Sequence, residues 1–228
     1  MTRAAIDPVI RAARPGEAAE LLALEAAAGR RYLAARGAIP RAASLGLSAA
    51  GFVAETCSTP STAAFRLRAS DENPGARRHE GLHHGLLAAG LPGDLEGLPP
   101  ELVDAAIAEG TTWVCVDAAD RPIGFALCWI REDALHLREL DVAPEHMGRG
   151  LGRALVEFVC AKAAELELGR VTLTTFAEVE WNAPLYRRWG FEVLEPAATP
   201  AWLAAIRAQE DAGELREWPR VAMGRRVR

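Results

Sequence analysis

One stretch, from Leu135 to Gly169, constrains the fold more than any other part of this sequence. It begins with the strand-like run 135–142, turns at 143–146 and enters a glycine-rich loop at 147–152. Apolar residues then fall three and four positions apart, which predicts a helix that stops at Gly169 as its C′ residue. A strand, a glycine loop and a helix N-terminus in succession can bind an anionic phosphate group, because several backbone N–H groups face one point.

Two familiar phosphate-binding loops do not fit this spacing. A Walker loop needs Lys followed by Ser or Thr after its second glycine, but Arg153 and Ala154 follow Gly152. A dinucleotide-binding loop that starts at Gly148 needs a third glycine where Arg153 stands. The loop therefore belongs to neither class.

The loop instead resembles the acetyl-CoA loop of the GNAT superfamily of N-acetyltransferases, whose pattern is Gln/Arg-x-x-Gly-x-Gly/Ala. It reads Met147-Gly148-Arg149-Gly150-Leu151-Gly152 here. Met147 departs from the family pattern, because it cannot donate the side-chain hydrogen bonds of Gln or Arg. In the family the loop's backbone amides do most of the pyrophosphate binding, so the resemblance survives this departure.

A second segment, 181–191, resembles the other CoA-binding segment of the family, an Asn-led short helix that carries a tyrosine and ends in Gly-Phe. Asn182 is the expected N-cap, Pro184 suits the first helical turn and Gly190 suits the C-terminal stop. Two independent motifs in the family's order make the resemblance specific. It covers residues 91–228 well and 9–37 loosely.

The resemblance implies an α/β fold of GNAT type, with a mixed, mostly antiparallel sheet, a central parallel splayed strand pair and flanking helices. The sequence pattern agrees with that order. Strands are expected at 9–13, 111–116, 122–130, 135–142, 171–176, 191–194 and 220–223, and helices at 14–37, 99–110, 151–168 and around 202–206. Because a crossover helix joins 135–142 to 171–176, these two strands must run parallel.

We expect one domain over 1–228 with a flexible surface insertion at about 39–90, where the periodicity is lost. A lid over the acceptor site is the alternative interpretation. The insertion holds His79, His83 and His84, which could share a helix face and bind a metal. Adjacent glycines disfavour that helix, so no metal site is expected.

Bulk properties exclude several classes of protein. The net charge of -5 and pI of about 5.6 argue against a nucleic-acid-binding surface. The N-terminus has no signal-peptide core and no run is long enough to span a membrane, which predicts a cytoplasmic protein with no membrane partner. The four cysteines, Cys57, Cys115, Cys128 and Cys160, show no metal or redox spacing, and no disulfide is expected.

The resemblance also implies roles for single residues. Backbone groups of the central strand would pair with the pantetheine arm of CoA, loop amides would hold its pyrophosphate, and the short helix would contact the arm. The cofactor-binding candidates are Leu140, Asp141, Val142, Met147, Gly148, Arg149, Gly150, Leu151, Gly152, Arg153, Asn182 and Tyr186. An amide near Val142 could also polarise the thioester carbonyl.

Three residues are candidates for proton transfer. Tyr186 matches the family's general acid, which protonates the departing thiolate. Glu139 is the first candidate for the base that an alkylammonium acceptor needs, and His136 is the second. In a regular strand Glu139 lies on the face of Leu135 and Leu137, away from His136. A surface carboxylate is an equally good interpretation of Glu139.

The resemblance implies direct acetyl transfer from acetyl-CoA, the co-substrate, to a primary amine of a small molecule or peptide, without a metal. Acidic residues at the expected acceptor mouth, Glu132, Asp133, Asp141, Glu178 and Glu180, would suit a cationic amine, although acidic loops are often only solvated. Two alternatives stay open: a protein N-terminal acetyltransferase, and an acyl-CoA sensor or scaffold without turnover. A homodimer is also open, since dimers are common in the family.

Overall fold

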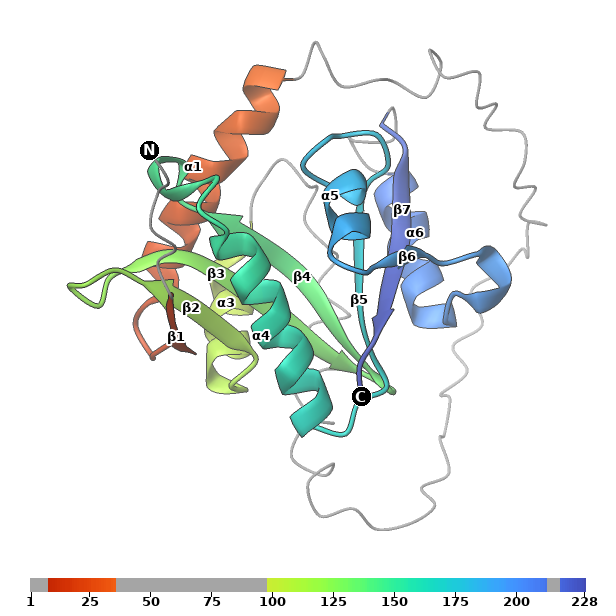
Figure 1. Cartoon of the computed structure of the whole chain (residues 1–228), viewed down its shortest axis with the longest axis horizontal. Helices are drawn as coiled ribbons and strands as arrows, with labels where there is room; N and C mark the ends of the chain where they lie inside the picture. Colours follow the sequence, from red (N-terminus) through yellow and green to blue (C-terminus); the bar gives the residue numbers. More distant parts are fainter. Residues whose placement is uncertain (1–7, 36–97, 213–217) are drawn as a thin grey trace.

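The computed structural model describes residues 8–35, 98–212 and 218–228 (Figure 1). In chain order its elements are β1 (Val9–Ala12), α1 (Ala18–Ala35), α3 (Pro100–Ala108), β2 (Thr112–Val116), β3 (Pro122–Arg131), β4 (Ala134–Val142), the 3₁₀ turn η4 (Pro144–His146), α4 (Leu151–Glu165), β5 (Arg170–Phe176), α5 (Ala183–Arg188), β6 (Glu192–Val193), η5 (Pro196–Ala198), α6 (Ala201–Ala212) and β7 (Arg220–Arg226).

The strands form one seven-stranded sheet in the order β1-β2-β3-β4-β5-β7-β6. All neighbouring strands pair antiparallel except β4 and β5, which run parallel. The expected mixed, mostly antiparallel sheet with one central parallel pair is therefore confirmed.

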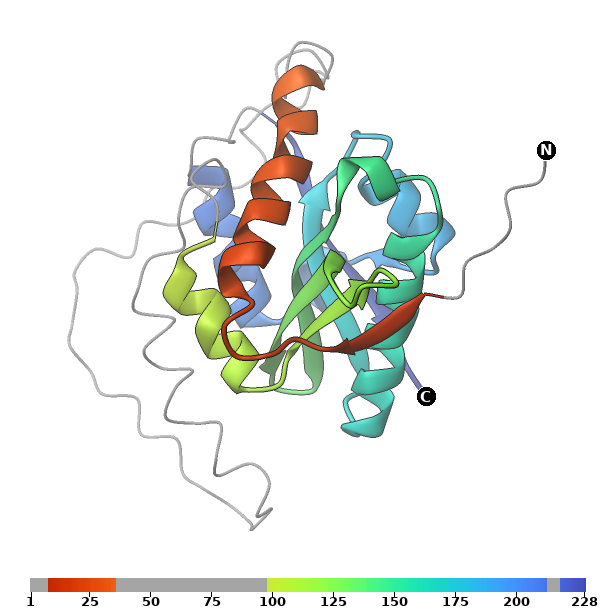
Figure 2. The ribbon, with the colours of Figure 1, turned by 90° about the vertical axis from the view of Figure 1, so that its left-hand side faces the viewer.

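Helices cover both faces of this sheet (Figure 2). On one face α4 packs its side chains, among them Leu155 and Val159, against strand residues such as Leu135. On the other face α1 and α3 pack against β3, where Phe125 and Leu127 belong to the core, and α6 packs against β7. We call these the α4 face and the α1 face. Each has its own apolar core, so the sheet is held from both sides.

The parallel strands β4 and β5 part soon after they meet. Their pairing covers only Ala134 to His136 on β4 and Arg170 to Thr172 on β5. From Leu137 to Val142, β4 pairs with β3 alone among the described strands, while β5 pairs with β7 along its whole length. The sheet thus opens into a wedge between β4 and β5, as the splayed pair expected from the sequence requires.

A β-bulge in β4 changes which residues share a face. Leu137 lies opposite Cys128 and Glu139 lies opposite Leu127, so Arg138 is an extra residue in the strand. After one inserted residue the alternation of side chains reverses. Glu139 therefore shares the α1 face with His136, and the expectation that it lies on the face of Leu135 and Leu137 is wrong.

The C-terminal end of α4 also differs from the expectation. The helix ends at Glu165, its C-cap is Leu166, and Glu167 takes the left-handed conformation with φ of 57°. Gly169 is therefore not the C′ residue. It lies beyond the turn, where its N–H donates to the Asp133 carbonyl at 2.8 Å and begins the approach to β5.

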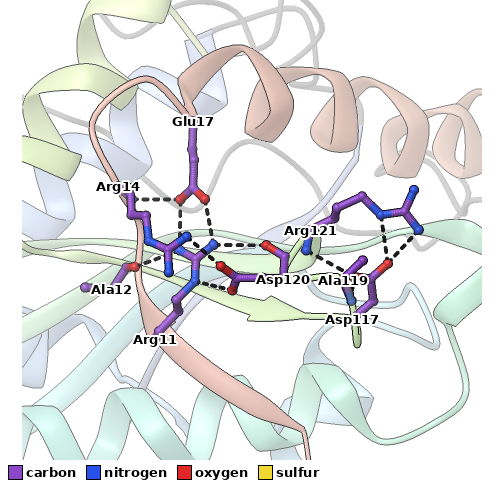
Figure 3. A network of polar contacts seen from close by, with 8 residues as sticks. All are labelled: Arg11, Ala12, Arg14, Glu17, Asp117, Ala119, Asp120 and Arg121. Carbon is purple, nitrogen blue, oxygen red and sulfur yellow. Dashed lines mark hydrogen bonds and ion pairs between the residues drawn. The ribbon is translucent and has the colours of Figure 1, made fainter.

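An ion-pair network joins β1, the start of α1 and the β2–β3 turn (Figure 3). The Arg11 guanidinium donates to Glu17 at 2.6 Å and to Asp120 at 2.8 Å. The Arg14 backbone N–H donates to the same Glu17 carboxylate at 2.7 Å. The network fixes the entry of α1 onto the sheet, which matters because α1 contributes to the site.

Several expectations fall outside the described residues. They concern the insertion at 39–90, His79, His83, His84 and Cys57. Within the described residues, Cys115, Cys128 and Cys160 are free and buried. No described helix is both long and apolar enough to cross a membrane. Within the described residues, no group of three or more His, Cys, Asp or Glu side chains is arranged so that it could hold a metal ion.

Candidate active site

The glycine loop has the backbone shape that an anion site needs. Gly148 and Gly150 take left-handed φ values of 72° and 83°, which cost a residue with a side chain roughly 1–2 kcal/mol. Gly150 is the N-cap of α4, and the first backbone bond of that helix runs from Ala154 N–H to Gly150. The amides of Leu151, Gly152 and Arg153 therefore precede the helical ladder, where they are available to a phosphate.

The side chains of the loop take different positions. Arg149 donates to the Glu145 carbonyl at 3.0 Å and so braces the turn before the loop. Arg153 is exposed on the first turn of α4. Met147 is the C-cap of η4, and its own N–H donates to the Pro144 carbonyl. The loop can thus offer two guanidinium groups near its amides, although only Arg153 extends into solvent.

The second sequence motif packs directly against the first. A Cβ placed on Gly152 would lie 3.6 Å from the Trp189 ring and 3.9 Å from a Val142 methyl group. The end of β4, the start of α4 and the end of α5 therefore meet at Gly152. This contact brings together three residues from segments that the sequence analysis singled out independently.

The end of α5 matches the expectation. Gly190 has a φ of 85°, its N–H donates to Arg187, and the Phe191 N–H donates to Tyr186. These two bonds are those of a Schellman motif, which stops a helix at a glycine. Gly190 as the C-terminal stop is confirmed.

Asn182 stands at the N-cap position of α5 but does not act as a side-chain cap. No cap hydrogen bond joins its side chain to the helix within the described structure. Its Nδ2 instead donates to Thr175 Oγ1 on β5 at 2.6 Å, and the residue is buried. The expectation of a side-chain N-cap is wrong. Asn182 joins α5 to β5, because a buried side-chain amide needs a hydrogen-bond partner.

Tyr186 lies in an aromatic group on α5. Its ring meets Trp189 edge-on with centroids 5.4 Å apart and Phe191 with centroids 5.6 Å apart. The residue is half-buried and packs onto the α4-face core. The ring contacts therefore fix the orientation of Tyr186, while part of the residue stays exposed.

His136 is placed in the core rather than in an open site. It is 1% exposed, and its Nδ1 lies 3.1 Å from Thr172 Oγ1. Its ring contacts Trp129 and Trp202. Burial lowers the pKa of His136 to about 3, so the ring is neutral near pH 7. A base with such a pKa accepts a proton poorly.

Glu139, by contrast, lies at the partly open end of the α1 face. Its side chain is 27% exposed and pairs with the Arg138 guanidinium at 3.5 Å. Asp141 shares this face, because it lies opposite Phe125 just as Glu139 lies opposite Leu127. Of the two candidate bases, Glu139 is partly exposed and His136 is buried.

Four features of the site escaped the sequence analysis. Glu25 on α1 influences the ionisation of Asp141 across the α1 face, Thr175 binds Asn182, and the bulge residue Arg138 sets the face of Glu139. Gly124 on β3 lets Val142 come close, since an added Cβ would lie 3.0 Å from the Asp141 carbonyl. Only Gly124 carried a sequence signal, as an isolated glycine inside a strand pattern.

Residues 85–191 match the acetyltransferase (GNAT) family. Two curated relatives have the same printed name, peptidyl-lysine N-acetyltransferase YjaB. The protein of Escherichia coli strain K12 is 32% identical over 110 residues, which cover 48% of this chain and 66% of the relative. The protein of Salmonella typhimurium is 30% identical over 117 residues, which cover 51% of this chain and 72% of the relative. The chain belongs to the GNAT acetyltransferase family.

The fold of this GNAT chain is also that of a solved relative. Rv2747 from Mycobacterium tuberculosis, determined in complex with CoA, aligns with a TM-score of 0.54 at 16% identity, covering 97% of this chain and 100% of that one. At such identity the likeness concerns the fold alone. It agrees with the splayed sheet and the loop–helix junction described above.

Proposed function

We propose that this GNAT chain transfers the acetyl group of acetyl-CoA to a primary amine, and that a lysine side chain of a peptide is a suitable acceptor. One observation carries the proposal: the amides of the 147–153 loop, the open edge of β4 and the aromatic end of α5 converge at Gly152. The lysine acceptor is supported by the relatives, both of which are named as peptidyl-lysine N-acetyltransferases.

The residues present suit CoA. The free amides at the start of α4 would hold its pyrophosphate, with Arg153 beside them. The β4 backbone from Leu140 to Val142, which lacks a partner on the β5 side among the described strands, would pair with the amide groups of the pantetheine arm. Acetyl-CoA supplies an acetyl group activated as a thioester. The Val142 amide would donate to the acetyl oxygen as negative charge develops there.

Glu139 is the proposed base. An alkylammonium has a pKa near ~10 and must lose a proton before its nitrogen can attack. Glu139 is partly exposed on the α1 face and lies one residue before Leu140, at the edge of the wedge. It would take the first proton from the ammonium, directly or through a water molecule. His136 is not proposed for this role, since it is buried and its pKa is low.

Tyr186 is the proposed acid. Its ring contacts Trp189 and Phe191 at the C-terminal end of α5. The phenol would donate its proton to the sulfur as the carbon–sulfur bond breaks. In the complete reaction an ammonium and a thioester give an amide, a thiol and one proton, which leaves through the base.

Acetyl transfer can be tested on a lysine peptide with a blocked N-terminus. Wild type and Tyr186→Phe would be titrated with acetyl-CoA by calorimetry, and thiol release would then be followed at saturating acetyl-CoA. Lys162 is the only lysine in the sequence, so Lys162→Arg gives an enzyme with no lysine of its own and removes acetylation of its own lysine side chain as background. We expect turnover in wild type and Lys162→Arg, and a fall of about 100-fold or more in Tyr186→Phe with acetyl-CoA affinity preserved.

Two outcomes would redirect the proposal. Acetylation of a free N-terminus on a lysine-free peptide, without acetylation of the lysine peptide, would identify an N-terminal acetyltransferase. Tight acetyl-CoA binding with no turnover on lysine peptides, free N-termini or small amines would identify a sensor. An absence of acetyl-CoA binding would refute the proposal altogether.

A further inference from the structure

Asp141 belongs to a group of three carboxyl groups on the α1 face. Glu139 and Asp141 project from β4 on this face, because they lie opposite Leu127 and Phe125 of the α1-face core. Glu25 comes from α1, which crosses the same part of β4. The three groups lie on the opposite side of the sheet from the phosphate-binding loop and α4, where an acceptor would meet the acetyl group.

The three carboxyl groups differ in their partners. Glu25 accepts the Leu98 N–H at 3.0 Å, and Glu139 pairs with Arg138. Asp141 keeps some exposure as a residue, but its Oδ2 is buried and has no hydrogen-bond partner among the described residues. A buried carboxylate oxygen without a hydrogen-bond partner raises the free energy of the folded protein. A ligand with hydrogen-bond donors and a positive charge would lower that free energy.

The surroundings of Asp141 favour its neutral form. Burial, then the Glu139 charge, then the Glu25 charge raise the pKa of Asp141 well above its usual range. The residue opposite it on β3 is the apolar Phe125. Burial raises the pKa of Glu25 as well, although the Leu98 N–H and the Arg138 charge lower it in part; the Arg138 charge also lowers the pKa of His136. The ionised form of Asp141 is therefore unfavourable in the free protein, and a bound cation would stabilise it.

We propose that Asp141 selects a positively charged acceptor: the alkylammonium group binds at Oδ2 and donates the hydrogen bond that this oxygen lacks among the described residues. Binding forms a carboxylate–ammonium pair, and any proton that Asp141 carries beforehand is released to solvent. The inference rests on the proposed acetyl transfer and narrows its acceptors to aliphatic amines that are charged before they react, of which a lysine side chain is one. Glu139, the proposed base on the same face, would then remove the proton from the bound ammonium.

The test is to count protons on acceptor binding. Nα-acetyl-L-lysine methylamide would be titrated into the protein saturated with CoA, which has no acetyl group to transfer. Calorimetry in two buffers of different ionisation enthalpy at pH 6.5 gives the number of protons released. Because the pKa of Asp141 is raised, we expect wild type to release more protons than Asp141→Asn, whose affinity for the probe falls at least 10-fold. The uncharged analogue Nα-acetyl-L-norleucine methylamide should not bind.

Asp141→Asn is expected to fold, because asparagine has the shape of the protonated aspartate. At pH 7 it should be more stable than wild type, and the gain should vanish as the pH falls toward 4. A raised pKa makes the ionised form unfavourable in the fold, so the wild-type protein loses stability between pH 4 and the raised value. The matched control is Asp104→Asn, an exposed aspartate on α3, which should release as many protons as wild type does.

Equal proton release by wild type and Asp141→Asn would overturn the inference. So would acetyl transfer to an amine uncharged at the assay pH at the rate seen with the lysine probe. In both cases turnover on amines persists and the proposed function stands. Loss of acetyl-CoA binding and of turnover on every amine would instead be a failure of the proposed function.

Discussion

The burial of His136 predicts a specific dependence of stability on pH. We consider His136→Asn, in which the asparagine amide takes the place of Nδ1 beside Thr172 Oγ1 but does not titrate. The substitution removes ring contacts with Trp129 and Trp202, which should cost about 1–3 kcal/mol of unfolding free energy at any pH. The informative quantity is how the difference between wild type and variant changes with pH.

The magnitude follows from the pKa. The ordinary value is 6.5, and burial, together with the Arg138 charge, lowers it to about 3 in the fold. Between these values the unfolded chain binds a proton that the folded chain does not, so the wild-type protein loses about 1.4 kcal/mol of stability for each pH unit below 6.5. From pH 7 to pH 5 the advantage of wild type over His136→Asn should therefore shrink by about 2 kcal/mol.

The assay is urea unfolding of both proteins at pH 7, 6 and 5, with unfolding free energies obtained by linear extrapolation. Groups that titrate in both proteins, including Asp141 with its shift in the opposite direction, largely cancel in the difference. A difference that stays constant from pH 7 to pH 5 would show that His136 titrates normally in the fold. The reasoning about its burial would then be refuted.

The same variant separates the two candidate bases. If Glu139 is the base, His136→Asn should keep its turnover number at pH 7 within a few-fold of wild type, whereas Glu139→Gln should lose about 100-fold or more. A comparable loss in His136→Asn, measured on protein shown to be folded, would return the role of base to His136.

Three further predictions concern residues that support the strands, loop and helix around the site. Gly124→Ala should lose about 1–3 kcal/mol of stability and weaken acetyl-CoA binding, because its Cβ would lie 3.0 Å from the Asp141 carbonyl and 3.3 Å from a Val142 methyl group; thermal unfolding and calorimetry check this. The matched control Gly29→Ala, in α1 with nothing within 4 Å, should stabilise by about 0.5–1 kcal/mol, and similar behaviour of the two variants would contradict the close approach. Gly150→Ala should reduce acetyl-CoA affinity at least 10-fold, because its φ of 83° is unfavourable with a side chain; an unchanged Kd would show that the loop does not bind CoA. Glu17→Gln should destabilise by about 1 kcal/mol at pH 7, since Arg11 lowers the pKa of Glu17, and the loss should disappear as the pH falls below 4; denaturant unfolding at pH 7 and pH 3 that gave equal losses would exclude the ion pair as its cause.

The sequence alone determined the architecture and the phosphate-binding end of the site, because these depend on local rules. Glycines at 148 and 150 permit left-handed backbone whatever surrounds them, and both take it. A strand, a crossover helix and another strand must give a parallel pair, and Gly190 stops α5 where a glycine is expected.

The acceptor side was decided by tertiary structure. The face of the sheet on which Glu139 lies depends on one inserted residue, Arg138. The side-chain type of Arg138 does not indicate a bulge. Once the alternation reverses, His136, Glu139 and Asp141 share a face, and α1 brings Glu25 to it.

Partners distant in the sequence also decided the surroundings of Asn182 and His136. Asn182 turned from the helix end to Thr175, and His136 was buried between two tryptophans. The physical reason is common to these cases. Backbone conformation is largely specified by near neighbours, whereas the ionisation and partners of a side chain depend on what the folded chain places around it.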